Sequence, residues 1–533
     1  MEKKLPEMIK EEWDVKEKAV SVTLLVALVV LLLTSCGSGV VEQVESDASP
    51  ELEYASFEEL AGLSIGVLTG SAQPQLVSAV IPTAELVYLN GSSDLYQALK
   101  THKVDAYAED EVIIQLMSAD DDSVSWIPAY LDTSKFAFAF TKDKQGEALC
   151  SEMNEFVQSM YEDGTIDELK EIWTGSDEER KQPSGYESLP AVNGTIHAAV
   201  DSESMPMVYV KDNAIVGFEI DLLARFCAAR GYALEIEDMT FSAVLASVQS
   251  GKCDIAAASL AVSEERSKVM LFSKPHFETG VVLVVRTSAD GEHIGFLQRI
   301  GNSFEKTFLD ENRYQLFLAG IGNTILISIL SVLFGTALGF LVYLLCRRGG
   351  RFTNGVTAAA IWIVQAMPVL VLLMVLYYLI FDSVSISGVV VAVIGFTISF
   401  GASVYGMLCS GVNAVDKGQT EGAYALGVSS RQTFFDIVLP QAIPHILPSY
   451  KGEVGALIKG TSIVGYIAVQ DLTKMGDIVR GRTYEAFFPL VAVAVIYIIL
   501  AVLLNLVVGK VIDRIDPRKR SREAILKGVD THD

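Results

Sequence analysis

Four long stretches in the second half of the chain contain no Asp, Glu, Lys or Arg: residues 315–346, 352–381, 383–415 and 486–509. A helix that crosses a bilayer needs about 20 mainly apolar residues, and each stretch can supply them. Buried helices of a globular protein do not need so many uncharged runs of this length. We therefore predict an all-α polytopic membrane domain. A fifth, weaker candidate lies at 452–470, where Glu453 and Lys459 interrupt the apolar run.

The basic clusters predict how these spans are oriented. "CRRGGR" (346–351) follows the first span and "DRIDPRKRSR" (513–522) follows the last. Such clusters are typical of cytoplasmic segments. Five spans place both clusters on the same side of the membrane, whereas four place them on opposite sides. We therefore expect about five transmembrane helices, with 37–310 outside the cell, and 412–450 and the C-terminus in the cytoplasm.

Charge and cysteine content limit the partners. The 533 residues carry a net charge of −25, and the acidic excess lies before residue 315, whereas the rest of the chain is slightly basic. An acidic extracellular part argues against nucleic-acid binding. The six cysteines show no CxxC spacing, so we expect neither a metal site nor a disulfide framework. Cys150, Cys227 and Cys253 are expected to be small buried residues.

The N-terminus predicts export. "AVSVTLLVALVVLLLTSCGSG" (19–39) holds an apolar run that is short for a membrane span but suits a signal peptide. Residues 33–37 resemble a bacterial lipobox, which implies a signal peptide over 1–36 and a lipid on Cys36. An uncleaved signal anchor is the alternative, and in both cases the chain after residue 36 is exported. We expect a linker over 37–56.

The loop between the third span and the weak one carries its own pattern. Residues 416–427, "DKGQTEGAYALG", predict a short helix closed by Gly427. Ser429 or Ser430 can cap a second helix, "RQTFFDIVL" (431–439), which Pro440 is expected to end.

This loop resembles the coupling loop of ABC importer permeases at four positions: Glu421, Gly422, Ala423 and Gly427. Together with "GIGNTILISILSVLFGTALG" and "KGTSIVGYIAVQDL", the resemblance extends over about 310–512 and is to the polar amino-acid permeases. "VQAMP" (364–368) departs from that family's pattern. The resemblance implies a permease homodimer whose loops dock two ATPase subunits.

The chain contains no G-x-x-x-x-G-K-[ST] motif, and its nearest run, "GALIKGTS" (455–462), lacks the lysine after its second glycine. We therefore expect no cofactor in this chain, with ATP bound by a separate partner subunit. We expect the chain to transport its ligand and not to act as an enzyme.

Residues 55–287 alternate short apolar strands with amphipathic helices, which is typical of an α/β fold. "GFEIDL" (217–222), "SGKCD" (250–254), "SEERSKVMLFSKPH" (263–276) and "DGTIDELKEIW" (163–173) resemble the two-lobed (type II) periplasmic amino-acid-binding proteins. The expected fold is therefore a two-lobed α/β domain followed by the membrane domain.

The order of these pieces differs from the family's. The segment resembling the first lobe is 194–287, and it comes after 57–175, which resembles the second lobe plus the segment returning from it. A polar linker, 176–193, joins them. Each part occurs once, so a single circularly permuted domain is favoured over two broken copies. A connector (288–312), the permease domain (313–515) and a tail (516–533) complete the expected organisation.

The resemblance also implies a binding site for an α-amino acid between the lobes. Arg266 would bind the carboxylate bidentately, and Asp110 would accept hydrogen bonds from the ammonium group. Ser259 offers a hydroxyl and Ala261 backbone groups. The start of a helix at Ser71 and Ala72 would favour an anion. Phe241 would pack on the ligand, and Asp201 completes the set, while Ser204 stands where an aromatic residue is common.

We therefore predict a bacterial amino-acid ABC importer subunit that joins the binding protein to the permease in one chain. A ligand-gated channel is the main alternative, since receptors also connect such clefts to membrane spans. An enzyme built on the lobed scaffold is a third, although no nucleophile and base come together in the sequence. The sequence does not identify the amino acid.

Overall fold

The structure is a computed structural model that describes residues 51–118, 121–288, 296–381, 384, 386–483, 485 and 487–515. Residues 51–291 and 302–533 belong to one unit, and the start of helix α10 (Phe296–Phe304) belongs to another. The predicted lipid site, Cys36, and the predicted tail, 516–533, lie outside the described residues.

The second lobe is built on a six-stranded sheet with the order β2-β1-β3-β14-β4, in which β5 also pairs with β14. Strand β1 is parallel to β2 and β3, while β14 is antiparallel to β3, β4 and β5. The elements of this lobe are η1 (Phe57–Leu60), β1 (Ser64–Leu68), α2 (Gln73–Val80), β2 (Glu85–Leu89), α3 (Ser92–Lys100), β3 (Ala106–Asp110), α4 (Glu111–Met117), β4 (Val124–Trp126), β5 (Asp132–Phe136) and β14 (Phe277–Arg286).

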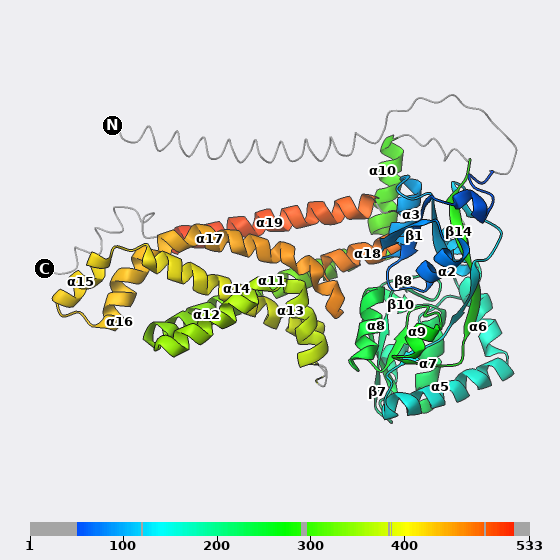
Figure 1. The fold of residues 1–533 in the computed structure, drawn as a ribbon, viewed down its shortest axis with the longest axis horizontal. Helices are drawn as coiled ribbons and strands as arrows, with labels where there is room; N and C mark the ends of the chain where they lie inside the picture. Colours follow the sequence, from blue (N-terminus) through cyan, green and yellow to red (C-terminus); the bar gives the residue numbers. More distant parts are fainter. Residues whose placement is uncertain are drawn as a thin grey trace. The chain divides into compact units, whose positions relative to one another are not determined.

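The first lobe holds a five-stranded sheet with the order β11-β7-β12-β6-β13 and a smaller sheet, β10-β9-β8. Helices α5 and α6 come from the segment before the linker, and α7, α8 and α9 from the segment after it (Figure 1). The elements are β6 (Ala139–Phe140), α5 (Lys144–Glu162), α6 (Thr165–Thr174), η2 (Tyr186–Ser188), β7 (Thr195–Val200), β8 (Glu203–Ser204), β9 (Val208–Lys211), β10 (Ala214–Val216), α7 (Phe218–Arg230), β11 (Ala233–Asp238), α8 (Phe241–Gln249), β12 (Ile255–Ala257), α9 (Glu264–Ser267) and β13 (Leu271–Phe272).

Two antiparallel strand segments pass from one lobe to the other. Phe136 pairs with Phe277 in the second-lobe sheet, and Ala139 pairs with Phe272 in the first-lobe sheet. Each sheet thus takes strands from both halves of the sequence: β6 comes from before the linker, and β14 from after it. The two halves therefore form one two-lobed domain, and neither half completes a lobe's sheet alone.

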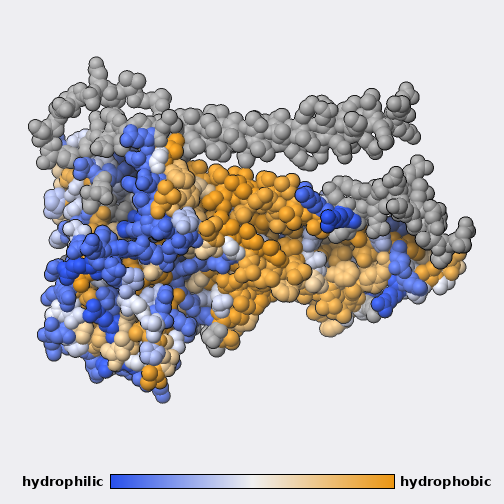
Figure 2. Space-filling view, turned by 180° about the vertical axis from the view of Figure 1, so that it is seen from behind, coloured by the Kyte–Doolittle hydropathy of each residue, from blue (hydrophilic) through white to orange (hydrophobic). Residues whose placement is uncertain are grey.

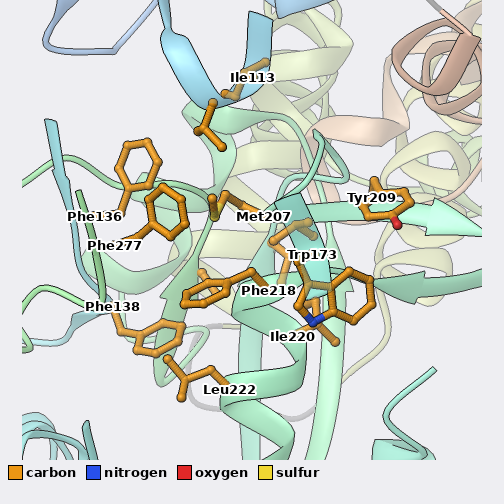
Figure 3. Close-up of a cluster of buried hydrophobic side chains, with 14 of the residues drawn as sticks. Ile113, Phe136, Phe138, Trp173, Met207, Tyr209, Phe218, Ile220, Leu222 and Phe277 are labelled. Carbon is orange, nitrogen blue, oxygen red and sulfur yellow. The ribbon is translucent and has the colours of Figure 1, made fainter. Parts of the chain in front are cut away.

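Aromatic side chains pack where the strands cross. Phe136, Phe138, Phe218 and Phe277 are buried in one cluster, which continues to Trp173 (Figure 3). The rings of Phe218 and Phe277 meet edge to face with centroids 5.3 Å apart. Because these four rings come from both halves of the sequence, the core also ties the halves together. The cysteines Cys150, Cys227 and Cys253 are buried and unpaired, as predicted.

The membrane part contains three helices that are long and apolar enough to span a bilayer, or up to five spans if each of two bent pairs counts as one. The three helices are α11 (Tyr314–Arg348), α14 (Gly388–Asn413) and α19 (Phe487–Ile515). Their outward faces form a largely apolar surface (Figure 2), with side chains such as Leu333 and Val507 more than half exposed. Such a surface suits lipid contact.

The predicted span over 352–381 is broken. Helix α12 (Arg351–Ala366) and the helical stretch α13 (Val369–Val375) plus η5 (Leu376–Ile380) meet at an angle of 106°. The break falls at Met367 and Pro368, within the "VQAMP" that departs from the family pattern. Met367 has the extended backbone that a following proline imposes, which ends α12 there.

The weak fifth candidate belongs to the second bent pair. Its first arm runs from α16 (Ser430–Gln432) through η6 (Thr433–Val438) and α17 (Leu439–Gly460) to η7 (Thr461–Ile467). The second arm, α18 (Leu472–Thr483), bends away by 56°. Shorter elements, η3 (Glu305–Leu309) and η4 (Asp310–Asn312), precede α11.

The predicted helix pair of the loop is present, with one correction. Helix α15 (Lys417–Ala425) is followed by Gly427 in the left-handed conformation (φ +79°), and Ser429 forms a capping box with Gln432. Pro440, however, does not end the second helix, which continues to Gly460. The turn before it, η6, is a π-helix, whose wider geometry accommodates a residue without an N–H.

Candidate functional site: the interlobe cleft

A small cavity of about 40 Å³ lies between the two lobes. Seven of the eight residues predicted to bind ligand line it: Ser71, Ala72, Asp110, Phe241, Ser259, Ala261 and Arg266. They come from both halves of the sequence and from both lobes. The small volume means that the two walls lie close together in this structure.

Arg266 reaches from the first lobe to the second. It sits on the short helix α9, where the Ser263 hydroxyl accepts a hydrogen bond from its backbone N–H. Its Nη1 donates to the Ala261 carbonyl (2.9 Å), and its Nη2 donates to the Gly70 carbonyl (2.7 Å) in the second lobe. The guanidinium also lies over the ring of Phe241, 5.6 Å from its centroid. Burial lowers the pKa of Arg266 below its usual value, but the group stays charged at neutral pH.

Two neighbouring carboxyl groups, Glu109 and Asp110, form the facing wall at the end of β3. Glu109 is 2% exposed and Asp110 9%. Within the described part of the chain, Glu109 Oε2 and Asp110 Oδ1 have no hydrogen-bond partner. Burial raises the pKa of Asp110 to about 6, while Ser134 hydrogen-bonds with it and opposes that rise. Burial and the charge of Asp110 raise the pKa of Glu109 to about 8.

This arrangement can receive a zwitterion. A buried carboxylate with no neighbouring cation and one unpaired oxygen is costly, and a cationic ligand group that pairs with Asp110 would lower that cost. The Arg266 guanidinium now donates to neutral backbone carbonyls, which a ligand carboxylate can replace with a charge-assisted pair. The site therefore offers one positive and one negative group from opposite walls.

The start of α2 completes the second-lobe wall. Ser71 donates its hydroxyl hydrogen to the Leu68 carbonyl and accepts from the Gln73 backbone N–H. Ala72 is the N-cap residue, so the helix begins at Gln73, two residues later than Ser71. The free N–H groups and the dipole of this helix start favour an anionic group nearby.

Ser259 is held by a buried network that the sequence pattern did not suggest. Its backbone N–H donates to Glu219 Oε2 (3.0 Å), and Glu219 Oε1 lies 2.9 Å from His276 Nε2. Both Glu219 and His276 are fully buried. The Ser259 hydroxyl has no partner among the described residues and lies on the cavity wall. The network thus fixes the backbone of Ser259, whose φ is +52°, and leaves its hydroxyl available.

Asp201 is the predicted ligand-binding residue that does not line this cavity. It follows β7 and lies 3.8 Å from the Nζ of Lys474 in α18. Ser204, three residues later, does line the cavity. The side chains at this end of the first lobe therefore diverge, some toward the cleft and some toward the membrane part.

The cavity also contains residues that sequence reasoning did not single out, among them Gln73, Ser92, Glu109 and Ser134. Glu109 stood in an acidic run, "YAEDE", where only Asp110 was chosen. A usable signal existed: "KVDAYAED" predicts a strand, and two acidic residues at the end of a strand that is buried, as β3 is at all five positions, are unusual.

The four predicted coupling residues lie at the far end of the membrane part (Figure 1). Glu421, Gly422 and Gly427 are exposed, and Ala423 is buried against the following helical turn. Next to them Leu426 is 85% exposed and Tyr424 47% exposed. This loop therefore presents apolar side chains from a rigidly capped helix pair.

The sequence comparisons concern the membrane part. Residues 307–521 match the family described as binding-protein-dependent transport system inner membrane component. The putative glutamine transport system permease protein GlnP of Rickettsia felis is 34% identical over 200 residues, which is 36% of this chain and 88% of that protein. The chain belongs to this permease family. The probable amino-acid ABC transporter permease protein YckA of Bacillus subtilis is 32% identical over 34% of this chain and 80% of that protein.

Among solved structures, an amino acid ABC transporter crystallised with histidines matches 43% of this chain and 100% of that chain. Its sequence identity is 27% and its TM-score 0.36.

Proposed function

We propose that this chain is an amino-acid ABC importer subunit that joins the ligand-binding domain to its permease. One observation carries the proposal: a permease-family chain also holds a cleft in which a half-buried guanidinium and a buried carboxyl group face the same cavity, and one oxygen of that carboxyl group has no hydrogen-bond partner among the described residues. These are the two charges that an α-amino acid requires. Relatives named as glutamine, cystine and amino-acid permeases support this ligand class.

The chain makes or breaks no covalent bond in its ligand, and a separate ATPase supplies the energy. Two copies would form the translocation path, with the loop at 416–440 of each docking one ATPase subunit in the cytoplasm. The binding domain would lie outside the cell, anchored through a lipid on Cys36 or through the signal segment itself. The exposed Leu426 and Tyr424 support such a docking role for the loop. The comparisons give no support to a ligand-gated channel.

The full chain in lipid nanodiscs tests the ligand class directly. Each of the twenty standard amino acids is added in turn while the unfolding temperature is measured, and calorimetric titration is then done for those that stabilise. We expect one or a few polar amino acids to bind at one site per chain. Stabilisation by none of them, or binding with no dependence on the α-carboxylate and α-ammonium groups, would overturn the proposal.

A further inference from the structure

Helix α18 contacts the binding domain through charged side chains of its own. It contacts α3 of the second lobe and β8 and β9 of the first (Figure 1). At a separate place, Lys252 of the first lobe donates to the carbonyls of Phe381 and Val384 in the membrane part.

Met475 and Ile478 of α18, both 1% exposed, pack with Val210 of β9. Charged side chains lie around this apolar patch at other positions of the helix, among them Lys474, Asp477 and Arg480.

Lys474 is the first contact point and is only 2% exposed. Its Nζ lies 3.8 Å from Asp201, 3.7 Å from Glu203 and 3.6 Å from Asp238, all in the first lobe. Nζ forms no hydrogen bond within the described part of the chain. One buried cation among three carboxylates is stable only while the lobe that carries them stays in place.

Arg480 is the second contact point. It pairs with Asp94 of α3 in the second lobe and with Asp477 of its own helix (2.9 Å). Gly481 comes next, and a Cβ atom placed there would lie 3.3 Å from the Cβ of Glu203. A Cβ at Gly91 of the second lobe would in turn lie 2.8 Å from Glu203 Oε2. The end of α18 therefore lies where the two lobes meet.

Both contact points adjoin the ligand cavity. Ser204, next to Glu203, and Ser92, two residues before Asp94, line that cavity. When lobes open around a hinge, residues at the cleft's edge separate more than those near the crossing strands. Asp94 and Glu203 sit on opposite sides of this edge, so their separation reports whether the cleft is closed.

We propose that α18 is a two-point docking element for the closed state of the chain's own binding domain. Lys474 holds the carboxylates of the first lobe and Arg480 holds Asp94 of the second. Both contacts form together only when the lobes are closed, so ligand occupancy and docking favour each other. The ligand's identity rests on the proposed function, whereas the docking contact does not. Lys474 and Arg480 are positioning residues and touch no ligand.

A crosslinking experiment on the full chain in nanodiscs tests this inference. The Asn213 amide and the Gln315 side chain join the first lobe to α11 at 3.4 Å and belong to neither contact point. With Asn213→Cys and Gln315→Cys, a short bifunctional thiol reagent should link the two positions. Mass spectrometry of the linked peptides gives the rate, with and without the bound amino acid.

We expect Lys474→Met to slow this crosslinking about tenfold and Arg480→Gln to abolish its acceleration by ligand. Lys144→Met, an exposed lysine of α5, is the matched control and should change neither rate. Asp94→Arg combined with Arg480→Asp should restore the ligand effect. Unchanged crosslinking in both single variants, or no rescue by the exchange, would overturn the inference.

Two further measurements keep the result interpretable. Glu203→Gln removes one carboxylate without disturbing α18 and should also slow crosslinking, which tests the contact if Lys474→Met does not fold. Ligand binding is measured separately by calorimetry, and no ATPase is present. If no amino acid binds but crosslinking still depends on Lys474, the proposed function is contradicted and the docking role of α18 is not.

Discussion

The interlobe cavity and the α18 contact place buried charges together in different ways. In the cavity, oxygens of Glu109 and Asp110 have no partner among the described residues. At α18, Asp201, Glu203 and Asp238 surround Lys474 of the same chain. Burying an unpaired carboxylate is costly, whereas a nearby cation offsets much of that cost. The carboxyl groups of the cavity therefore lack a positive charge that a ligand can bring, whereas those at α18 already have the positive charge of Lys474.

The strongest test of this comparison removes the charges of the cavity. Asp110→Asn or Arg266→Ala would leave one ligand charge buried without a partner, which costs about 2–5 kcal/mol. At about 1.4 kcal/mol per tenfold, the affinity should fall about 30-fold to several thousand-fold. Calorimetric titration of the full chain measures this.

Glu111→Gln is the matched control, because Glu111 stands beside Asp110 but accepts a hydrogen bond from Tyr130 away from the cavity. It should bind as the unmodified chain does. Near-native affinity in Asp110→Asn or Arg266→Ala would remove that residue from the site.

A second prediction tests whether the loop at 416–440 couples ligand binding in the cleft to ATP-driven transport. Gly427 has φ +79°, so a β-branched residue there is strained by about 1–3 kcal/mol and should distort the helix pair of the loop. Gly427→Val should leave ligand affinity unchanged and reduce ATP-driven uptake at least tenfold.

Uptake by membrane vesicles containing the ATPase subunit checks this. Gly427→Asn is the control, because asparagine tolerates the left-handed conformation, and it should transport normally. Normal uptake by the valine variant would separate this loop from coupling.

The sequence predicted the fold class and the two-lobed domain, and seven of its eight candidate ligand residues line the cavity, because each was identified from a short motif with local geometry. Asp201 does not line the cavity and lies beside Lys474, which is 273 positions away in the permease, so no short motif around Asp201 indicates that contact. The break at Met367 and the continuation of the helix past Pro440 were also missed. Both depend on how the helical turns around one proline accommodate it. The length of an apolar run gives no information about that.

A third prediction uses the pH. The pKa of Asp110 in the ligand-free protein is about 6, above its usual 3.8. Below pH 6 the carboxyl takes up a proton and no longer pairs with an ammonium group, so ligand affinity should fall by up to tenfold per pH unit.

The stability of the ligand-free protein should move in the opposite direction. A raised carboxyl pKa means that the folded state binds the proton more tightly, so this group makes folding more favourable as the pH falls from about 6 toward 4. Asp110→Asn should remove the contribution of this carboxyl group to the pH dependence of ligand affinity and to that of stability. Calorimetric titration gives the ligand affinity at pH 5 and 7, and unfolding measurements give the stability of the ligand-free protein at the same two pH values. Affinity and stability that change in the same direction between these pH values would contradict the assignment.

A smaller effect is expected at Ser259. Its hydroxyl is buried on the cavity wall without a partner in the described chain, so removing it should not weaken the ligand-free protein. A neutral hydrogen bond to the ligand is worth about 0.5–1.5 kcal/mol, so Ser259→Ala should weaken binding about two- to tenfold. Asp143→Ala is the contrast, because Asp143 caps α5 away from the cavity and its loss should lower stability instead. Loss of stability in Ser259→Ala without loss of affinity would give Ser259 a structural role only.

The smallest effect on affinity is expected at Asp201, and it divides the two clusters most sharply. Asp201 is 6% exposed, as buried as Asp110, but it faces Lys474 and not the cavity. Asp201→Asn should therefore change ligand affinity less than threefold, since Glu203 and Asp238 still neutralise Lys474, while crosslinking of the first lobe to α11 slows. A tenfold loss of affinity with unchanged crosslinking would return Asp201 to the ligand site. It would also mean that burial beside a permease cation does not distinguish a docking carboxylate from a binding one.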